Sequence, residues 1–331
     1  MRFISIVMGC YNEQENLSEV YERVTRVMEE RLPHYAYEIL VIDNASTDAS
    51  VDVLRAICAK DKRVKVIVNT RNFGHIRSPY HALLNAGGEA AIYMASDLQD
   101  PPEMIPEFVE KWEAGYKIVL AQKTNSQESH LFWLVRSVYY HLVTSLSEVE
   151  LVKNATGFGL YDRVVLEKIR EIGDPYPYLR GLICELGYSR ALVPFEQPTR
   201  KRGLTKNNLY TLYDIAILGI TNHSKVPLRL ATFFGFCLGT LSFLLAFAYL
   251  VYKLLFWSSF QLGTAPVVVG IFFFSAVQLF FIGLLGEYIG SIHTQVLRRP
   301  PVVERERINF AEDVGNIDES CEAGMPVGAQ R

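Results

Sequence analysis

Two carboxylates and an amide follow an apolar run in the stretch YMASDLQDPP, residues 93–102. Asp97 and Asp100 flank Gln99, and carboxylate and amide oxygens are ligands for divalent cations such as Mg²⁺. Only Asp97 lies directly behind the apolar run, where a strand should end. Mg²⁺ keeps water and phosphate ligands and often uses only one or two protein carboxylates. The stretch therefore predicts an Mg²⁺ or Mn²⁺ site on Asp97 and Gln99, with Asp100 as a further candidate; a helix-capping turn without metal is the alternative.

A second set of candidate side chains lies near the N-terminus. Tyr11 and Glu13, in the segment CYNEQEN, come just after the apolar residues 3–9. At the end of a strand, an aromatic ring could stack on a base, and a carboxylate could hold a ribose or a base edge. Ordinary packing for Tyr11 and a solvated helix start for Glu13 are the structural alternatives.

These side chains need elements to position them. Five near-continuous apolar runs predict strands at residues 3–9, 37–43, 64–69, 90–96 and 117–122, and helical patterns lie between them at 15–31, 49–59, 78–86 and 103–114. Strands that are apolar on both faces, alternating with helices, predict an open, mostly parallel α/β sheet. Ligands of such sheets gather beyond the carboxyl ends of the strands. Asp43 ends the second run and Asp97 follows the fourth.

Two long uncharged segments follow the sheet. Residues 230–252 carry no charge, and as a helix they would extend about 34 Å at roughly 1.5 Å per residue, enough for a bilayer core of about 30 Å. Residues 254–286 are also uncharged, with a loop expected near 257–264. Lys225 and Arg229 precede the first segment, and Arg298 and Arg299 follow the second. The excess of basic residues predicts a transmembrane hairpin with both ends in the cytoplasm.

The segments around this hairpin are polar or amphipathic. A basic segment with a glycine, PTRKRGLTKNN, precedes a helical pattern at 209–228 that is expected to lie at the membrane interface. The tail after Pro301 is acidic and polar, so we expect it to be poorly ordered.

Composition and missing motifs exclude several classes of protein. The net charge is −3, which argues against a globally basic nucleic-acid binder. The five cysteines lie far apart without a CxxC pair, which argues against a zinc site or a disulfide framework and suits a reducing compartment. A GxGxxG after the first strand and a GxxxxGK[ST] are both missing, which disfavours dinucleotide and P-loop sites.

Several motifs together carry a family resemblance over residues 3–295. The segments IVMGCYNEQENL, LVIDNASTDAS, TRNFG, SDLQDPPEMIPEFVEKWEAGY, RKRGLTK and VPLRLAT resemble those of glycosyltransferase family 2 enzymes that load a sugar onto a polyprenyl phosphate, the bactoprenol glucosyltransferase and dolichyl-phosphate mannose synthase group. The resemblance implies inverting transfer from a nucleotide sugar, UDP-glucose first, to undecaprenyl phosphate. It also implies a divalent metal and a homo-tetramer at the cytoplasmic face of the plasma membrane.

The same resemblance divides the chain and assigns roles to its residues. It implies a GT-A nucleotide-sugar domain at 1–205, juxtamembrane amphipathic helices at 206–228, two transmembrane helices at 229–292 and a partly disordered cytoplasmic tail at 293–331. Asp43 matches the family's base-recognising acid, whereas Asp48 is better explained as a turn or N-cap residue. The implied catalytic residues are Asp97, Arg200 and Lys206, and the implied donor-binding residues are Tyr11, Glu13, Asp43, Lys123, Arg136 and Arg202.

The basic loop suits a phosphate site. Its glycine allows close approach to phosphates, and its arginines can pair with phosphate oxygens. A juxtamembrane patch attracted to anionic lipid is the alternative for RKR, and the two roles are compatible.

The chain also departs from the family pattern. Relatives commonly read DADLQDPPE and DDGSTD, whereas this chain has Ala95 in place of the first acid and Asn44 in place of the second. Gly157 and Gly159 stand where relatives often carry an Asp, proposed as a base, and an Arg. A phosphate monoester is largely dianionic at pH 7, since its second pKa is about 6. We therefore expect transfer without a protein base; Asp162 or Glu185 as a substitute base is the rival account.

Two other functions are weaker interpretations. A processive polysaccharide synthase is disfavoured because no QxxRW-type motif is present and only two spans are expected. A non-catalytic nucleotide-sugar-binding membrane scaffold would explain Ala95 and Gly157, but Asp97, Gln99, Arg200 and Lys206 argue against such decay. The sugar itself stays open, with GDP-mannose, UDP-galactose and amino sugars as alternatives to UDP-glucose.

Overall fold

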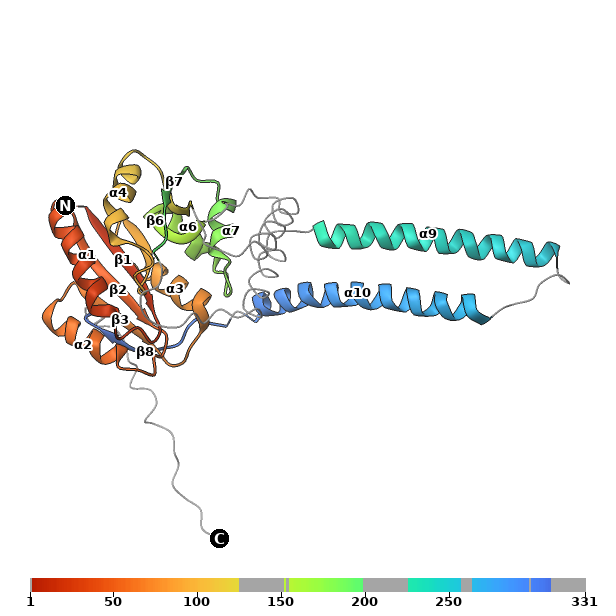
Figure 1. Ribbon diagram of the computed structural model, residues 1–331, viewed down its shortest axis with the longest axis horizontal. Coiled ribbons are helices and arrows are strands. Elements are labelled where there is room, and N and C mark those ends of the chain that lie inside the picture. Colours follow the sequence, from red (N-terminus) through yellow and green to blue (C-terminus); the bar gives the residue numbers. More distant parts are fainter. Residues whose placement is uncertain are drawn as a thin grey trace, which may run out of the picture.

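The computed structural model describes residues 2–124, 152, 155–198, 226–256, 264–297 and 299–310. A single mixed sheet has the strand order β7-β5-β6-β4-β1-β2-β3-β8, and two long helices extend from one side of this domain (Figure 1). The strands are β1 (Phe3–Cys10), β2 (Ala36–Asp43), β3 (Val64–Asn69), β4 (Ala90–Ala95), β5 (Ile118–Lys123), β6 (Ala155–Asp162), β7 (Arg190–Phe195) and β8 (Glu304–Ile308).

Helices cover both faces of the sheet. They are α1 (Leu17–Arg31), α2 (Ser50–Lys60), α3 (Gly74–Leu84), the short 3₁₀ helix η1 (Pro102–Met104), α4 (Ile105–Glu113), α6 (Arg163–Ile172), α7 (Leu179–Glu185), α9 (Val226–Leu255) and α10 (Thr264–Val296). On β1, Ile6 points into a core shared with α1, α2 and α4, whereas Val7 points into a second core shared with α3, α6 and α7. Burial on both faces explains why the strand sequences are continuously apolar.

The predicted α/β sheet is confirmed. The five predicted strands correspond to β1–β5, and β4, β1, β2 and β3 pair in parallel. Three pairs, β4 with β6, β5 with β6 and β3 with β8, are antiparallel. Helix α3 begins at Gly74, four residues before the predicted start, because Pro79 lies inside the helix and not at its first turn.

Strand β6 lies inside the sheet, between β5 and β4, and was not predicted. Its sequence, ATGFGLYD, contains two glycines, which weaken a strand pattern. Gly159 is required by close approach, since a Cβ there would lie 2.1 Å from the carbonyl oxygen of Val119 on β5. An arginine at this position would not fit the pairing seen here.

The expectation of a poorly ordered tail after Pro301 is wrong for residues 304–308. These residues form β8, which pairs with β3 at the edge of the sheet. Asn309 follows in a left-handed conformation (φ 61°) and donates from Nδ2 to the carbonyls of Cys58 (2.8 Å) and Val64 (2.9 Å). The sequence ERERI lacks the apolar pattern of a buried strand, because edge strands tolerate charged residues on both faces.

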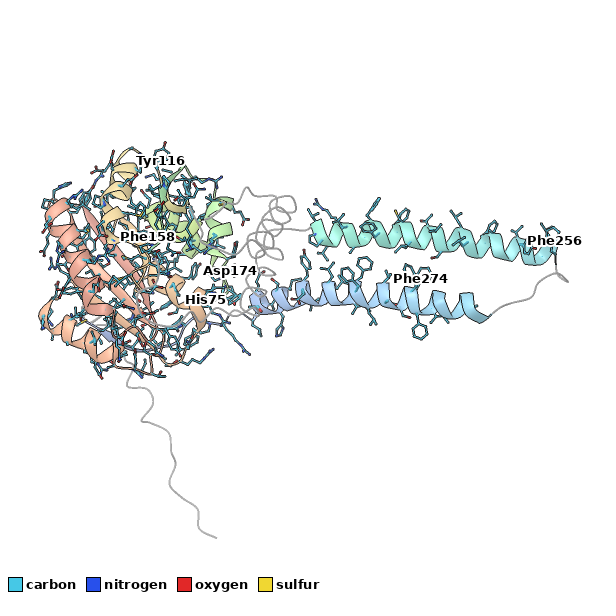
Figure 2. The ribbon with its side chains drawn as sticks, viewed as in Figure 1. His75, Tyr116, Phe158, Asp174, Phe256 and Phe274 are labelled. Carbon is cyan, nitrogen blue, oxygen red and sulfur yellow. The ribbon has the colours of Figure 1, made fainter. Side chains whose placement is uncertain are left out.

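The expected pair of long apolar helices is confirmed. Val226–Leu245 within α9 and Gly270–Val296 within α10 are each long and apolar enough to cross a membrane. Aromatic side chains are exposed along this hairpin, among them Phe256, just after the end of α9, and Phe274 on α10, which are 51% and 46% exposed (Figure 2). Exposed apolar surface of this extent calls for a lipid or protein partner.

Candidate functional site

The loops that follow β1 and β2 are joined by side chains. Asn12 donates from Nδ2 to Oγ1 of Thr47 (3.1 Å), and the Thr47 backbone N–H donates to Oδ1 of Asn12 (2.8 Å). The backbone N–H of Glu13 donates to Oγ of Ser50 (2.9 Å). Asp48 accepts from the Ser50 backbone N–H (2.9 Å) and so holds a turn, as its sequence context predicted. The two loops therefore form one surface at the carboxyl ends of the strands.

Asp43 and Glu13 lie close together beneath this surface. Both act on the Cys10 thiol: burial first, then the charges of Asp43 and Glu13, raise its pKa well above its ordinary value. Asp43 has no exposed surface and accepts hydrogen bonds from the backbone N–H and the hydroxyl of Ser46. Tyr11 is half-buried in the same loop. Direct contact between Asp43 and a bound base would require the Ser46 loop to shift.

Asn44 is the centre of a buried amide network. Its Oδ1 accepts from the Phe73 backbone N–H (2.8 Å) and from Asn69 Nδ2 (3.1 Å). Its Nδ2 donates to Asn72 Oδ1 (2.9 Å) and to the Gly74 carbonyl (3.1 Å). The backbone groups of Phe73 and Gly74 fix which end of the Asn44 amide is which. The network joins the end of β2 to the loop that starts α3.

Two loops reach the same end of β1. The Asn44 backbone N–H donates to the carbonyl of Cys10 (2.9 Å), and the Ser96 hydroxyl donates to the carbonyl of Gly9 (2.8 Å). The loop with Asp43 and the turn with Asp97 are therefore held by successive residues of one strand. The prediction that ligand-binding groups gather at this edge agrees with this arrangement.

The turn after β4 is tight and strained. Leu98 is buried and has a left-handed backbone (φ 61°), which is uncommon for a branched side chain. The Gln99 backbone N–H donates to Asp97 Oδ1 (3.1 Å), and the Ala95 backbone N–H donates to Asp100 Oδ2 (2.9 Å). These two bonds close the turn from both ends. Strain of this kind clusters at functional sites.

Asp100 is the buried member of this turn. Burial is the main reason that its pKa rises to about 7, and the charge of Asp97 adds to the effect. The Ala95 N–H and the charge of Lys123 oppose it. Lys123, at the end of β5, is thus close enough to act on the turn, as expected of a cation near a phosphate site.

Residues 97–100 fit a divalent cation only as a partial site. Asp97 and Gln99 are half-buried, whereas Asp100 is 5% exposed. Within the described part of the chain, no group of three or more His, Cys, Asp or Glu could hold a metal ion. One accessible carboxylate and an amide oxygen suit a hard cation that keeps water and phosphate ligands. Asp97 and Gln99 therefore fit Mg²⁺ or Mn²⁺ bound together with a diphosphate.

The structure separates the two rival bases. Asp162 lies opposite Ala90, at the far end of β4 from Asp97. There it caps α6 through the Val164 N–H (3.0 Å) and accepts from the side chains of Trp112 (2.7 Å) and Lys117 (2.9 Å). Burial opposes its ionisation, but these hydrogen bonds outweigh burial and lower the pKa of Asp162. Glu185 is exposed at the end of α7. Asp162 is therefore placed as a structural residue.

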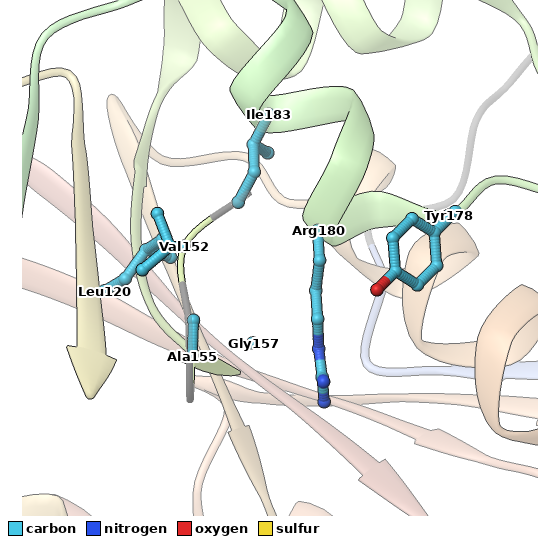
Figure 3. A pocket seen from close by; sticks show the side chains of 7 residues that line it. All are labelled: Leu120, Val152, Ala155, Gly157, Tyr178, Arg180 and Ile183. Carbon is cyan, nitrogen blue, oxygen red and sulfur yellow. The ribbon is translucent and has the colours of Figure 1, made fainter. Parts of the chain in front are cut away.

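A pocket next to Gly157 contains a cation that the sequence patterns did not single out. It is lined by residues of β5, β6 and α7 and by Val152 (Figure 3). Arg180, in the first turn of α7, is its charged residue. The signal that could have found it is an arginine within the otherwise apolar segment YLRGLI. The lining residues are Leu120, Val152, Ala155, Gly157, Tyr178, Arg180 and Ile183.

Four predicted site residues, Arg136, Arg200, Arg202 and Lys206, lie outside the described residues. The last described residue before the basic segment is Pro198, and its carbonyl is 3.5 Å from Nε2 of Gln99. Pro198, the last described residue of this part of the chain, therefore lies beside the Asp97 turn.

Comparison with known proteins agrees with this arrangement. The model of the family "Glycosyl transferase family 2" matches residues 5–170. An uncharacterized glycosyltransferase, YkcC, of Bacillus subtilis is 33% identical, covering 89% of this chain and 91% of the relative. The SfII prophage-derived bactoprenol glucosyl transferase of Shigella flexneri is also 33% identical, covering 91% and 96%.

Solved structures are more distant. Glucosyl-3-phosphoglycerate synthase from Mycobacterium tuberculosis is 17% identical, with a TM-score of 0.47 over 66% of this chain and 78% of that one. The family model and the relatives at 33% identity establish the family of this chain. The chain belongs to glycosyl transferase family 2.

Proposed function

We propose that this protein transfers one sugar from a nucleotide sugar, with inversion, to a polyprenyl phosphate such as undecaprenyl phosphate at the cytoplasmic face of the plasma membrane. The observation that carries the proposal is the combination of acidic loops at the carboxyl ends of β1, β2 and β4 with two helices of bilayer length in one chain. The name of the Shigella relatives, bactoprenol glucosyl transferase, supports a prenyl phosphate acceptor and UDP-glucose as the first candidate donor.

The donor would lie across the strand ends. Tyr11, Glu13 and Asp43 would contact the nucleoside once the Ser46 loop shifts. Asp97 and Gln99 would hold the divalent cation, which neutralises charge on the donor diphosphate when it is bound. Basic side chains would hold the phosphates: Lys123 on β5, with Arg136, Arg200, Arg202 and Lys206 in segments outside the described residues.

The acceptor would supply its own nucleophile. A dianionic phosphate oxygen attacks the anomeric carbon, the bond from that carbon to the donor diphosphate breaks, and the electron pair leaves with the nucleoside diphosphate. No proton needs to be removed from a dianion, which agrees with Gly157 and with the structural role of Asp162. Catalysis then consists of positioning and charge stabilisation.

A donor panel tests the proposal. Full-length protein in detergent is incubated with radiolabelled UDP-glucose, UDP-galactose, UDP-N-acetylglucosamine or GDP-mannose and a polyprenyl phosphate, with Mg²⁺, Mn²⁺ or EDTA. We expect metal-dependent labelling of the lipid by one donor, with a rate that falls as the pH drops through about 6, where the acceptor takes up its second proton. Nucleotide binding without transfer from any donor would favour the scaffold function instead.

The oligomeric state is a separate part of the proposal. A homo-tetramer would let α9 and α10 of neighbouring copies cover one another's exposed aromatic side chains. Chemical crosslinking in native membranes tests it, and a species no larger than a monomer would contradict it.

A further inference from the structure

The pocket beside Gly157 has two kinds of surface. Leu120, Ala155 and Ile183 give it an aliphatic wall, and the ring of Tyr178 adds to this wall. Arg180 contributes the charge. Figure 3 shows the Arg180 side chain running from α7 towards the strand that carries Ala155 and Gly157. A cation beside an aliphatic wall is suited to an amphiphilic anion.

The Arg180 guanidinium has donors to spare. Its Nη2 donates to the carbonyl of Thr156 (3.2 Å). Among the described residues, no carboxylate forms an ion pair with it. The side chain is exposed, and a guanidinium carries five N–H donors in a fork that matches phosphate oxygens. With respect to the described residues, most of its hydrogen-bonding capacity is therefore available to an anion.

Gly157 leaves space next to this cation. Its backbone is left-handed (φ 91°), its carbonyl accepts from the Tyr161 hydroxyl (2.8 Å), and a Cβ there would meet no atom of the described residues within 4 Å. A side chain would be strained at this φ. Among the described residues, the place next to Gly157 is thus uncharged apart from Arg180, which lines the same pocket.

Arg180 also acts on the neighbourhood of the Asp97 turn. The phenol of Tyr93, on β4, has a pKa raised by burial and then by the charges of Asp100 and Asp97, and Arg180 opposes these charges. Strand β4 pairs with β6, and Tyr93 lies opposite Gly159. The cation and the candidate metal-binding carboxylate are therefore both near enough to affect Tyr93, which is partly buried in the core.

We propose that the open side of this pocket, around the exposed Arg180, binds the phosphate end of the lipid acceptor, with Arg180 binding the phosphate oxygens and the aliphatic side chains contacting the first part of the hydrocarbon chain. The inference rests on the proposed function and adds a residue and a binding surface to it. A donor diphosphate shares the phosphate chemistry, but its nucleoside would gain nothing from the aliphatic wall.

Kinetics of two Arg180 variants and one control test this assignment. Arg180→Gln removes the charge, Arg180→Lys keeps it without the fork, and Arg170→Gln removes an exposed arginine that also donates to a backbone carbonyl, that of Leu84 on α3. Full-length proteins in detergent are assayed for sugar transfer with a short polyprenyl phosphate and the active donor. The binding of UDP is measured separately by calorimetry. Thermal unfolding checks that each variant is folded.

We expect Arg180→Gln to raise KM for the lipid phosphate about 10- to 100-fold, the value of a charged hydrogen bond, with KM for the donor and UDP affinity unchanged. Arg180→Lys should recover part of the loss, and Arg170→Gln should behave as wild type. A rise in donor KM or a loss of UDP affinity would assign Arg180 to the donor and overturn the inference, as would an Arg180→Gln variant indistinguishable from wild type. Wild-type protein that transfers no sugar to lipid would instead overturn the proposed function, and this inference with it.

Discussion

At the scale of single residues, the Asp97 turn separates two carboxylates by burial. Asp97 is half-buried, whereas Asp100 is buried and closes the turn by accepting from Ala95. We expect Asp97→Ala to lower kcat about 10²- to 10³-fold, as loss of a transition-state charge contact does, and Asp100→Ala to lower it roughly tenfold through misplacement of Asp97. Steady-state transfer assays measure both effects, with Asp52→Ala, an exposed acid on α2, as control. Equal, mild losses at 97 and 100 would refute a metal site built on one carboxylate.

The loop DNASTD holds a strained alanine where relatives read glycine. Ala45 has a left-handed backbone (φ 60°), which costs an L-residue about 1–2 kcal/mol. Glycine would remove that strain, but the greater entropy of its unfolded chain would destabilise the folded state by about 0.4–1 kcal/mol. We therefore predict that Ala45→Gly raises the apparent Tm by about 2 °C. Ala56→Gly, inside α2 and without such strain, should lower it; an Ala45→Gly variant that also unfolds earlier would show that φ at 45 is not costly.

The neighbouring Asn44 should resist the same kind of change. Asn44→Asp also changes the loop towards the DDGSTD pattern. However, it replaces the amide NH₂ group, which donates to Asn72 Oδ1 and to the Gly74 carbonyl, with a carboxylate oxygen that can only accept. Each buried group left unpaired costs about 1–3 kcal/mol, so the variant should unfold several degrees earlier at pH 7.

The loss at Asn44→Asp should depend on pH with a defined sign. Burial against two acceptors raises the pKa of the new carboxyl group in the folded state. The stability of the variant is therefore greatest at low pH and falls as the pH rises through this raised pKa. Thermal unfolding at pH 5 and pH 8 should therefore show the gap to wild type widening at pH 8. A gap that is constant with pH would mean that the amide network has reorganised.

At the scale of elements, β8 fastens the chain that follows α10 to the sheet. Glu304 accepts from Arg307 Nη2 (2.8 Å) and pairs with His81 on α3 (2.6 Å). The hydrogen bond from Arg307 is the largest cause that lowers the pKa of Glu304. A lowered pKa means that this stabilisation is present above the ordinary value of about 4.3 and is lost as pH falls through the folded value.

We predict that Glu304→Gln lowers stability at pH 7 by up to about 1 kcal/mol, the range for partly exposed ion pairs, and that the difference from wild type shrinks as the pH falls below the ordinary carboxyl value of about 4.3. Thermal unfolding across this range measures it. Glu306→Gln is the matched control. Glu306 lies on the same strand, and its ion pair with Arg55 of α2 is more exposed, so its loss should have a smaller effect on stability. An equal loss in the two variants at all pH values would mean that strand charge in general, and not the Glu304 pairing, holds β8.

At the scale of the whole molecule, α9 and α10 present large apolar side chains to the surroundings, including Phe236 (73% exposed) and Phe272 (74% exposed). Helices with such long apolar segments are stable in a bilayer and not in water. We expect the protein to stay in the membrane fraction after alkaline carbonate extraction and to enter solution only with detergent. Release by carbonate alone would contradict a membrane-spanning hairpin.

The sequence by itself determined the class of molecule. Continuous apolar strands, two uncharged spans and the SDLQD and DNASTD segments were enough to predict the sheet, the long helices and the family, because burial on both faces and bilayer length leave a direct mark on composition. The sequence also predicted the side of the sheet on which Glu13, Asp43 and Asp97 lie, because ligands of parallel sheets bind beyond the carboxyl ends of the strands.

Tertiary structure decided what depends on contacts between distant segments. Strand β6 is a strand because β4 and β5 pair with it, although its glycines weaken the pattern. Strand β8 is charged and is held by β3 and α3. Asp162 was a candidate base in the sequence, but it lies at the far end of the sheet and accepts three hydrogen bonds. Arg180 was not a candidate, but it lines a pocket together with Gly157. Pairing partners and burial are properties of the fold, so residue type and spacing alone could not distinguish them.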